Sequence, residues 1–202
     1  MKSALSTLCL VLGFALFGVA AYYFIFIRPL DNTPPPVIGT VENFKLIDTE
    51  GVPFTSDKLA GKIWVADLVF TSCKMTCPML TRKMSNIYRS YELEDKVRFV
   101  SVSVDPERDT PEVLKKYSAD NGINNAKWYF LTGEMDEIRN LATKSLKLAS
   151  SEKDANLHSD RFVLIDGKLR VRGYYDPKDK QSLKKLFHEL ALVLNEENTH
   201  GS

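Results

Sequence analysis

Short continuous apolar runs alternate along this chain with longer segments in which apolar residues recur every three or four positions. The runs Ile63–Phe70 and Val97–Val104 are rich in β-branched and aromatic residues, which predicts two buried strands. A shorter run, Lys127–Leu131, predicts a third strand. Helices are predicted for the segments with the longer period, which are about Pro78–Tyr91, a segment opening at Asp109–Glu112, Glu134–Leu146 and Leu183–Leu194.

Two further segments predict hairpins. The first spans Phe44–Phe54 with its turn at Asp48–Gly51, and the second joins Arg161–Ile165 to Leu169–Tyr175. Strands that alternate with helices predict an α/β protein with a mixed sheet covered on both faces. The order β-α-β-α-β-α-β-β-α, with two cysteines at the first strand-to-helix junction, is the order that a thioredoxin-like fold requires.

The amino-terminal segment has the character of a membrane anchor. No charged residue occurs in the 25 residues Ser3–Ile27. As a helix they would span roughly 37 Å, enough to cross a hydrocarbon core of about 30 Å with some tilt. A cleaved signal peptide is the alternative, but its apolar region is usually shorter. Tyr22, Tyr23 and Arg28 suit the outer interface, so we expect a single-pass helix in a bacterial cytoplasmic membrane, with the domain on the periplasmic side.

The expected organisation is therefore an anchor over residues 1–30, a stiff Pro-rich linker over 31–39, a thioredoxin-like domain over 40–196 and a frayed tail over 197–202. The charge is nearly balanced, with 27 Lys and Arg residues against 26 Asp and Glu residues. This balance gives no reason to expect nucleic acid as a partner.

Cys73 and Cys77 stand where the first long strand becomes a helix. Pro78 is tolerated in the first turn of a helix and not in its interior, so the helix is predicted to start near Cys77. The helix dipole and nearby Lys74 are then expected to lower the pKa of the Cys77 thiol. Two such thiols can bind a soft metal, cycle through a disulfide, or do both. The alternative is that both cysteines are buried and only pack in the core.

The spacing between Cys73 and Cys77 limits the kinds of site that they can form. Thioredoxin-type oxidoreductases use C-x-x-C, whereas three residues separate Cys73 from Cys77. A structural zinc site would need another closely spaced pair of Cys or His, which the sequence lacks, while two thiolates with an imidazole suit Cu(I). His158 ends a polar loop before a predicted strand and is either the third ligand or an exposed loop residue. His188 is expected on the surface of the last helix and His200 in the tail.

Taken together, these segments resemble the SCO/SenC family. The resemblance covers roughly residues 40–194 in the right order, and an amino-terminal anchor is also typical of that family. It is carried by the following segments: Phe70–Pro78, Ser103–Thr110, Trp128–Gly133, His158–Asp166 and Arg172–Tyr175.

The resemblance implies a thioredoxin-like, membrane-tethered copper chaperone that helps to load the dinuclear copper centre of cytochrome c oxidase. It implies that Cys73, Cys77 and His158 are the copper ligands, with a copper-accepting oxidase subunit or another copper protein as partner. One departure is the segment Lys74–Thr76, because family members often have Pro after the first Cys and an acidic residue before the second. Met75 could add a thioether contact, although a packing role is expected.

Two other functions could use Cys73 and Cys77. A metallochaperone without enzymatic activity is expected, and the alternative is a thiol-disulfide oxidoreductase that cycles Cys73 and Cys77 to reduce the cysteines of an acceptor. The two roles are not exclusive, because only the reduced dithiol can bind copper. A peroxidase is disfavoured, because the Thr or Ser and the Pro that precede a peroxidatic Cys in peroxiredoxins are not matched. The acidic segment Asp105–Asp109 is expected to be a strand-to-helix turn with capping carboxylates and not a metal loop.

Overall fold

The computed structural model describes residues 13–20, 22, 32–74, 76–123, 127–148, 157 and 159–200. The chain divides into two units, Met1–Thr33 and Pro34–Ser202. In the first unit residues 13–20 are helical and exposed. Among the helices of the described residues, none is long and apolar enough to cross a membrane. Most of the anchor predicted over residues 1–30 lies outside the described residues, so that anchor stays a prediction.

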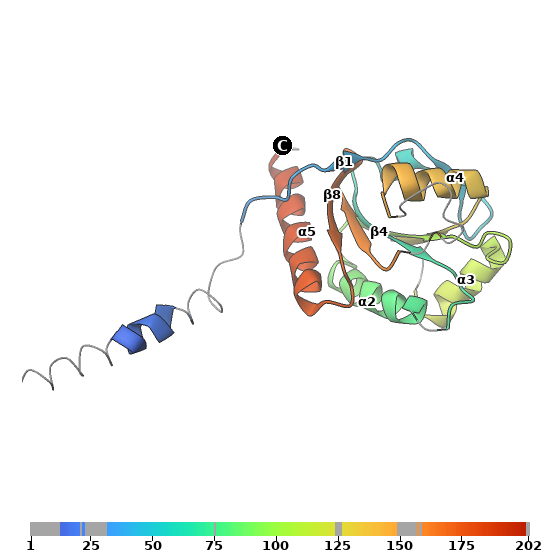
Figure 1. The fold of residues 1–202 in the computed structure, drawn as a ribbon. Helices are drawn as coiled ribbons and strands as arrows, with labels where there is room; N and C mark the ends of the chain where they lie inside the picture. The colour runs from blue at the N-terminus through green and yellow to red at the C-terminus, as the bar shows by residue number, and fades with distance from the viewer. Residues whose placement is uncertain are drawn as a thin grey trace, which may run out of the picture. The chain divides into compact units, whose positions relative to one another are not determined.

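The second unit is built on a mixed sheet of six strands in the order β1-β8-β7-β4-β5-β6 (Figure 1). Strands β4, β5 and β6 are parallel, whereas β7 runs antiparallel to both β4 and β8. The carboxyl ends of β4 and β5 therefore meet at one edge of the sheet. The strands are β1 (Gly39–Thr40), β4 (Ile63–Val69), β5 (Val97–Ser103), β6 (Trp128–Leu131), β7 (Phe162–Ile165) and β8 (Arg170–Tyr175).

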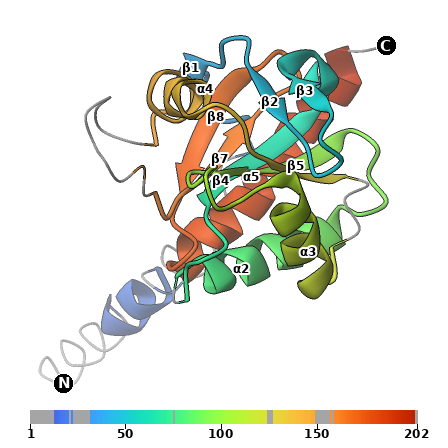
Figure 2. The ribbon, with the colours of Figure 1, turned by 90° about the vertical axis from the view of Figure 1, so that its right-hand side faces the viewer.

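Both faces of the sheet are covered, as the alternation within β4 requires. Trp64 and Ala66 belong to one apolar cluster, whereas Ile63 and Val65 belong to the other. The second cluster lies under three helices, α2, α3 and α5. Figure 2 shows α2 and α3 on one side of the sheet, with α4 and strands β2 and β3 on the other. The helices are α2 (Thr76–Ser90), α3 (Pro111–Asp120), α4 (Met135–Asn140) and α5 (Lys180–His200).

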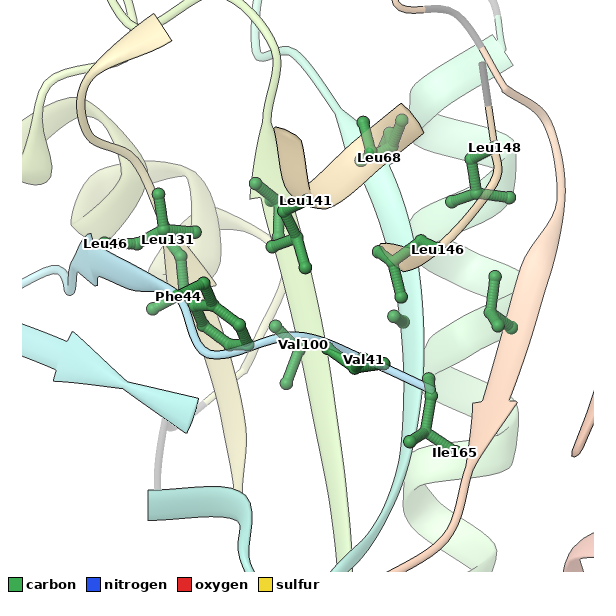
Figure 3. Packing of buried hydrophobic residues seen from close by; sticks show 14 of the residues in the cluster. Val41, Phe44, Leu46, Leu68, Val100, Leu131, Leu141, Leu146, Leu148 and Ile165 are labelled. Atoms are coloured by element: carbon green, nitrogen blue, oxygen red, sulfur yellow. The ribbon is translucent and has the colours of Figure 1, made fainter. Parts of the chain in front are cut away.

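The first predicted hairpin is confirmed as β2 (Lys45–Ile47) and β3 (Pro53–Thr55), followed by a 3₁₀ turn over Ser56–Leu59. Gly51 has a φ of +74°, which suits a residue without a side chain. The Asp48 carboxylate accepts from the backbone N–H groups of Glu50 and Val52 and so closes the turn. Leu46 of this hairpin packs with Phe44 and Leu131 in the cluster drawn in Figure 3.

The helix predicted over Glu134–Leu146 is divided in the structure. The α-helix ends at Asn140, and Leu141–Ser145 forms a π-helical stretch. The wider turn is closed by the Leu146 N–H, which donates to the Leu141 carbonyl at 2.8 Å. Leu141, Leu146 and Leu148 are all buried in the same cluster (Figure 3), which explains why the apolar period changes there.

Two predicted boundaries are corrected at the ends of the domain. Helix α5 continues through His200, so residues 197–200 are not a frayed tail. Glu197 explains this, because its carboxylate accepts from the Gly167 backbone N–H at 2.6 Å. The predicted linker is also partly held by the domain, since Pro35 is buried and its carbonyl accepts from Arg172 Nε at 2.8 Å. Gly39 at the end of that linker pairs with Val171 as part of β1, a strand that the apolar pattern did not predict.

Candidate dithiol site

The two predicted cysteines meet at the carboxyl end of β4. The strand ends at Val69, and the Cys73 N–H donates to the Phe70 carbonyl at 3.2 Å, which bends the chain toward α2. Helix α2 begins at Thr76, close to its predicted start. Cys73 is half-buried and Cys77 is buried, and no disulfide joins them in the structure. The Cys77 backbone N–H donates to Cys73 Sγ at 3.4 Å, so the two residues contact each other.

The expected electrostatic role of Cys77 is wrong. Burial raises the pKa of the Cys77 thiol to about 12, and the neighbouring Cys73 and Asp67 act in the same direction. A hydrogen bond from the Phe70 backbone favours the thiolate but does not outweigh the loss of solvent. The side chain of Cys77 is only 4% exposed. Cys77 lies in the first turn of α2 as predicted, but the sulfur that receives a backbone N–H at the start of this helix is that of Cys73.

A buried acid lies beneath the dithiol on β4. Asp67 is 1% exposed, and burial raises the pKa of its carboxyl group to about 7, although a hydrogen bond from Ser101 opposes this. Ser101 Oγ donates to Asp67 Oδ1 at 2.6 Å and in turn accepts from Trp128 Nε1 at 2.9 Å. Within the described residues Asp67 Oδ2 has no hydrogen-bond partner. The pattern of β4 did not single out Asp67, although a lone acid in an apolar strand is a signal that could have done so.

A second buried acid, in the loop after the neighbouring strand β5, bonds to the segment that leads to Cys73. Asp109, in the loop between β5 and α3, is fully buried and bonds to Thr71, two residues before Cys73. The carboxylates of the segment Asp105–Asp109 were expected to cap the helix that follows it. The cap is instead Thr110, whose hydroxyl accepts from the Val113 N–H at 3.4 Å. Asp109 was therefore placed in the correct turn but given the wrong partner.

A cavity of about 250 Å³ opens beside the two thiols. Its walls come from β4, from the first turns of α2, from the residue after β5 and from the segment before β7. Leu157 and Ser159, which flank position 158, both line it. The described lining residues are Leu68, Phe70, Cys73, Thr76, Cys77, Leu80, Val104, Leu157, Ser159 and Asp160.

The third predicted ligand, His158, lies outside the described residues, as does Met75. His188 lies on α5, as expected, and His200 is the last residue of that helix. Among the residues that the structure describes, no group of three or more His, Cys, Asp or Glu side chains is placed to hold a metal ion. The structure thus brings Cys73 and Cys77 together, while the role of His158 stays a prediction.

Comparison with known proteins agrees with this architecture. The family model SCO1/SenC matches residues 34–194. The SCO1 protein homolog of Bacillus subtilis is 36% identical over 141 residues, which are 66% of this chain and 73% of the relative. The match to the family model begins within the predicted linker and ends within α5.

Solved structures of the same family superpose on the chain. BsSco, described as a cytochrome c oxidase assembly protein with a disulfide switch, matches with a TM-score of 0.69 and 30% identity, over 80% of this chain and 96% of BsSco. ScoI of Bradyrhizobium japonicum with copper bound matches with a TM-score of 0.59 and 26% identity, over 73% of this chain and 97% of its own. The predicted thioredoxin-like α/β fold is confirmed by these neighbours.

Proposed function

Because this chain belongs to the SCO1/SenC family, we propose that it is a copper-binding metallochaperone that delivers copper to the dinuclear copper centre of cytochrome c oxidase. The observation that carries this proposal is the contact between Cys77 N and Cys73 Sγ at 3.4 Å, beside an open cavity. It is supported by relatives described as a copper-bound ScoI and as a cytochrome c oxidase assembly protein.

Copper is the cargo of this site. In the proposal Cys73 and Cys77 supply two thiolates and His158 supplies an imidazole, a set that suits Cu(I). Metal uptake by a thiol releases its proton, so binding through Cys77 overcomes a pKa of about 12 and depends on pH. Cys73 is the more exposed of the two sulfurs, so the ligands of an acceptor protein displace Cys73 before Cys77.

Membrane attachment is part of the same proposal. The uncharged segment Ser3–Ile27 forms a single-pass anchor in the cytoplasmic membrane, and residues 40–196 form a domain on its periplasmic side. The acceptor is a copper-binding subunit of the oxidase, which is itself a membrane complex. Tethering both proteins to one membrane raises their effective concentration for each other.

A thiol-disulfide oxidoreductase is the second candidate, because the two thiols differ in exposure. In that reaction the Cys73 thiolate attacks a disulfide of the acceptor, and one acceptor sulfur leaves as a thiolate. Cys77 then loses its proton and attacks Cys73 Sγ, which releases the second acceptor thiolate. The acceptor gains two electrons, and the protein is left with a Cys73–Cys77 disulfide.

A titration of the full chain with Cu(I) under reducing conditions tests the proposal. We expect about one tightly bound copper per chain, and weaker binding after Cys73→Ala, Cys77→Ala or His158→Ala. His188→Ala is the matched control, because His188 lies on α5 and is not part of the proposed site. Tight stoichiometric copper retained by the Cys73→Ala/Cys77→Ala double variant contradicts the site. Biological activity in oxidase assembly that survives His158→Ala favours the oxidoreductase over copper delivery.

A further inference from the structure

We propose that Asp109 is a positioning residue for the dithiol: it binds Thr71 and so holds the loop that places Cys73 against Cys77. The proposal rests on the proposed function only in taking the two thiols as the working groups of the protein. It assigns a role to a carboxylate that bonds to the cysteine loop at Thr71. Its consequence is that the affinity of the thiol pair for copper, and the stability of its disulfide, depend on Asp109.

The contacts of Asp109 are directed at one residue of the cysteine loop. Asp109 Oδ2 accepts from the Thr71 backbone N–H at 3.0 Å, and Asp109 Oδ1 accepts from Thr71 Oγ1 at 2.5 Å. A third donor, Ser103 Oγ, lies 2.6 Å from Oδ2. Both the backbone and the side chain of Thr71 are thus fixed by one carboxylate.

Asp109 is itself held firmly enough to position another segment. Its own backbone N–H donates to the Asp105 carbonyl at 2.8 Å, and the next residue, Thr110, caps α3. Ser103, at the end of β5, also accepts from the Asp105 backbone N–H at 3.1 Å. Since β4 and β5 are parallel neighbours, this turn lies beside the end of β4. The rigid β5–α3 turn is therefore the support, and the cysteine loop is what it holds.

The chemistry of the contact is unusual for a purely structural turn. Asp109 is 0% exposed, and the three donors just named are neutral groups. Burying a carboxylate is costly, and several hydrogen bonds from good donors are needed to offset it. Such a bond is also more directional than a packing contact. A buried carboxylate with two bonds to a single loop residue is therefore suited to hold that loop in one geometry.

Asp109 affects the relative position of the two sulfur atoms through the loop. Cys73 follows Thr71 by two residues, and the Cys73 N–H is bonded to the Phe70 carbonyl, directly before Thr71. A disulfide requires the sulfurs to approach to about 2.05 Å with a restricted dihedral angle, and a shared metal ion sets a similar constraint. A loop held in advance loses less conformational freedom in reaching either state. Loosening it lowers the effective concentration of one thiol for the other.

The test measures the equilibrium of the full chain with glutathione, in which oxidised glutathione takes two electrons from the dithiol to give the Cys73–Cys77 disulfide and two glutathione thiols. For Asp109→Ala we expect the constant for disulfide formation to fall about tenfold, equivalent to a potential about 30 mV less reducing. Cu(I) affinity falls in the same direction. Asp109→Asn keeps one acceptor oxygen for the Thr71 N–H and restores part of the loss.

Two further variants separate positioning from general stability. Thr71→Val removes only the hydroxyl donor, and combined with Asp109→Ala it adds less than its own effect, because both changes act on one contact. Val193→Ala in the buried core of α5 lowers the free energy of unfolding without touching the loop, so the glutathione constant stays that of the wild type. If Asp109→Ala does not fold, Asp109→Asn and Thr71→Val decide the question.

A wild-type constant in Asp109→Asn and Thr71→Val, at whatever cost in stability, overturns the proposal. So does a fall in Val193→Ala as large as that in the loop variants. The glutathione equilibrium needs no copper, and a chain that fails to bind copper still gives a result for Asp109. Failure of the positioning role and failure of the proposed function are thus distinguished.

Discussion

The two cysteines, although only four residues apart, have different surroundings. Cys73 is half-buried at the start of a helix, and its sulfur accepts a backbone N–H, whereas Cys77 is almost fully buried. Because the thiolate is the nucleophile, a thiol whose pKa is raised by burial reacts slowly. Cys73, the more exposed of the two, is therefore the thiol that reacts first with a reagent, an acceptor or a metal.

Alkylation of single-cysteine variants tests this asymmetry. The chain has a third cysteine, Cys9, so each variant also carries Cys9→Ser. Cys77→Ala then leaves only Cys73, and Cys73→Ala leaves only Cys77. With iodoacetamide at pH 8 we expect the Cys73 thiol to react at least about tenfold faster than the Cys77 thiol. Measurement in urea is the control, since both thiols then react alike. Equal rates in the folded protein would show that Cys77 is not shielded.

Asp67 predicts a dependence of stability on pH. Its pKa is raised in the folded state from 3.8 to about 7, so the folded state favours the protonated form. Below about pH 4 both states are protonated, and as the pH rises the unfolded chain loses its proton first. The free energy of unfolding therefore falls between about pH 4 and pH 7, by at most about 4 kcal/mol.

Asp67→Asn mimics the neutral acid and removes this dependence. We expect the variant to exceed the wild type in stability at pH 8 and to lose the advantage near pH 4, as measured by urea unfolding at each pH. The exposed Glu107→Gln serves as control and leaves the pH profile unchanged. Parallel profiles for wild type and Asp67→Asn would mean that the acid ionises without cost in the fold.

At the scale of elements, periodicity predicted most of the fold but not its ends. The segments around Trp64 and Phe99 are continuous apolar runs, and both form buried strands in the structure, as such runs predict. The extension of α5 was missed because residues 195–200 are polar, and only the bond from Gly167 to Glu197 shows why they stay helical. A contact between segments 30 residues apart leaves no periodic signal.

Truncation of α5 tests that contact. Deleting residues 197–202 removes the acceptor of the Gly167 N–H, and we expect a loss of about 1–2 kcal/mol in the free energy of unfolding. Deleting only residues 201–202 is the matched control. Glu197→Gln keeps an acceptor oxygen and should lie between the two. If the longer deletion is as stable as the control, the last turns of the helix contribute nothing.

At the scale of the whole molecule, one buried arginine joins distant parts of the domain. Arg172 of β8 is 4% exposed, and it bonds to the Pro35 carbonyl, to Asp166 at 2.9 Å and to Glu196 at 2.6 Å. The segment before β1, the β7–β8 turn and α5 are thereby held together. The composition of residues 31–39 predicted only a linker, because a local pattern does not show that a remote side chain binds a backbone carbonyl.

Arg172→Ala leaves two carboxylates without their shared partner, and we expect a loss of about 3–5 kcal/mol in the free energy of unfolding. Arg170→Ala is the control, because Arg170 is more exposed and bonds to Asp166 without reaching Pro35. Urea unfolding measures both. Hydrogen exchange at Ile38, whose N–H donates to the Val171 carbonyl, reports whether the segment before β1 is released. An unchanged exchange rate would show that Arg172 does not hold this segment.

Some residues of the candidate site could be predicted from the sequence and others could not. Cys73 and Cys77 could be named because thiols at a strand-to-helix junction have few other uses, and the structure brings them together. The raised pKa of Cys77 could not be predicted, because it depends on burial. The bond from Thr71 to Asp109 could not be predicted either, because it depends on how the parallel strands pack. His158 rests on the family resemblance and on its neighbours Leu157 and Ser159, which line the cavity.

X-ray absorption spectroscopy of the full chain loaded with Cu(I) identifies the atoms that bind the copper. We expect a three-coordinate site with two sulfur ligands and one imidazole nitrogen. His158→Ala should lose the nitrogen contribution, and Cys73→Ala one of the two sulfurs. Copper bound with no sulfur ligand, or a spectrum that neither variant changes, would contradict the proposal that Cys73, Cys77 and His158 hold the copper.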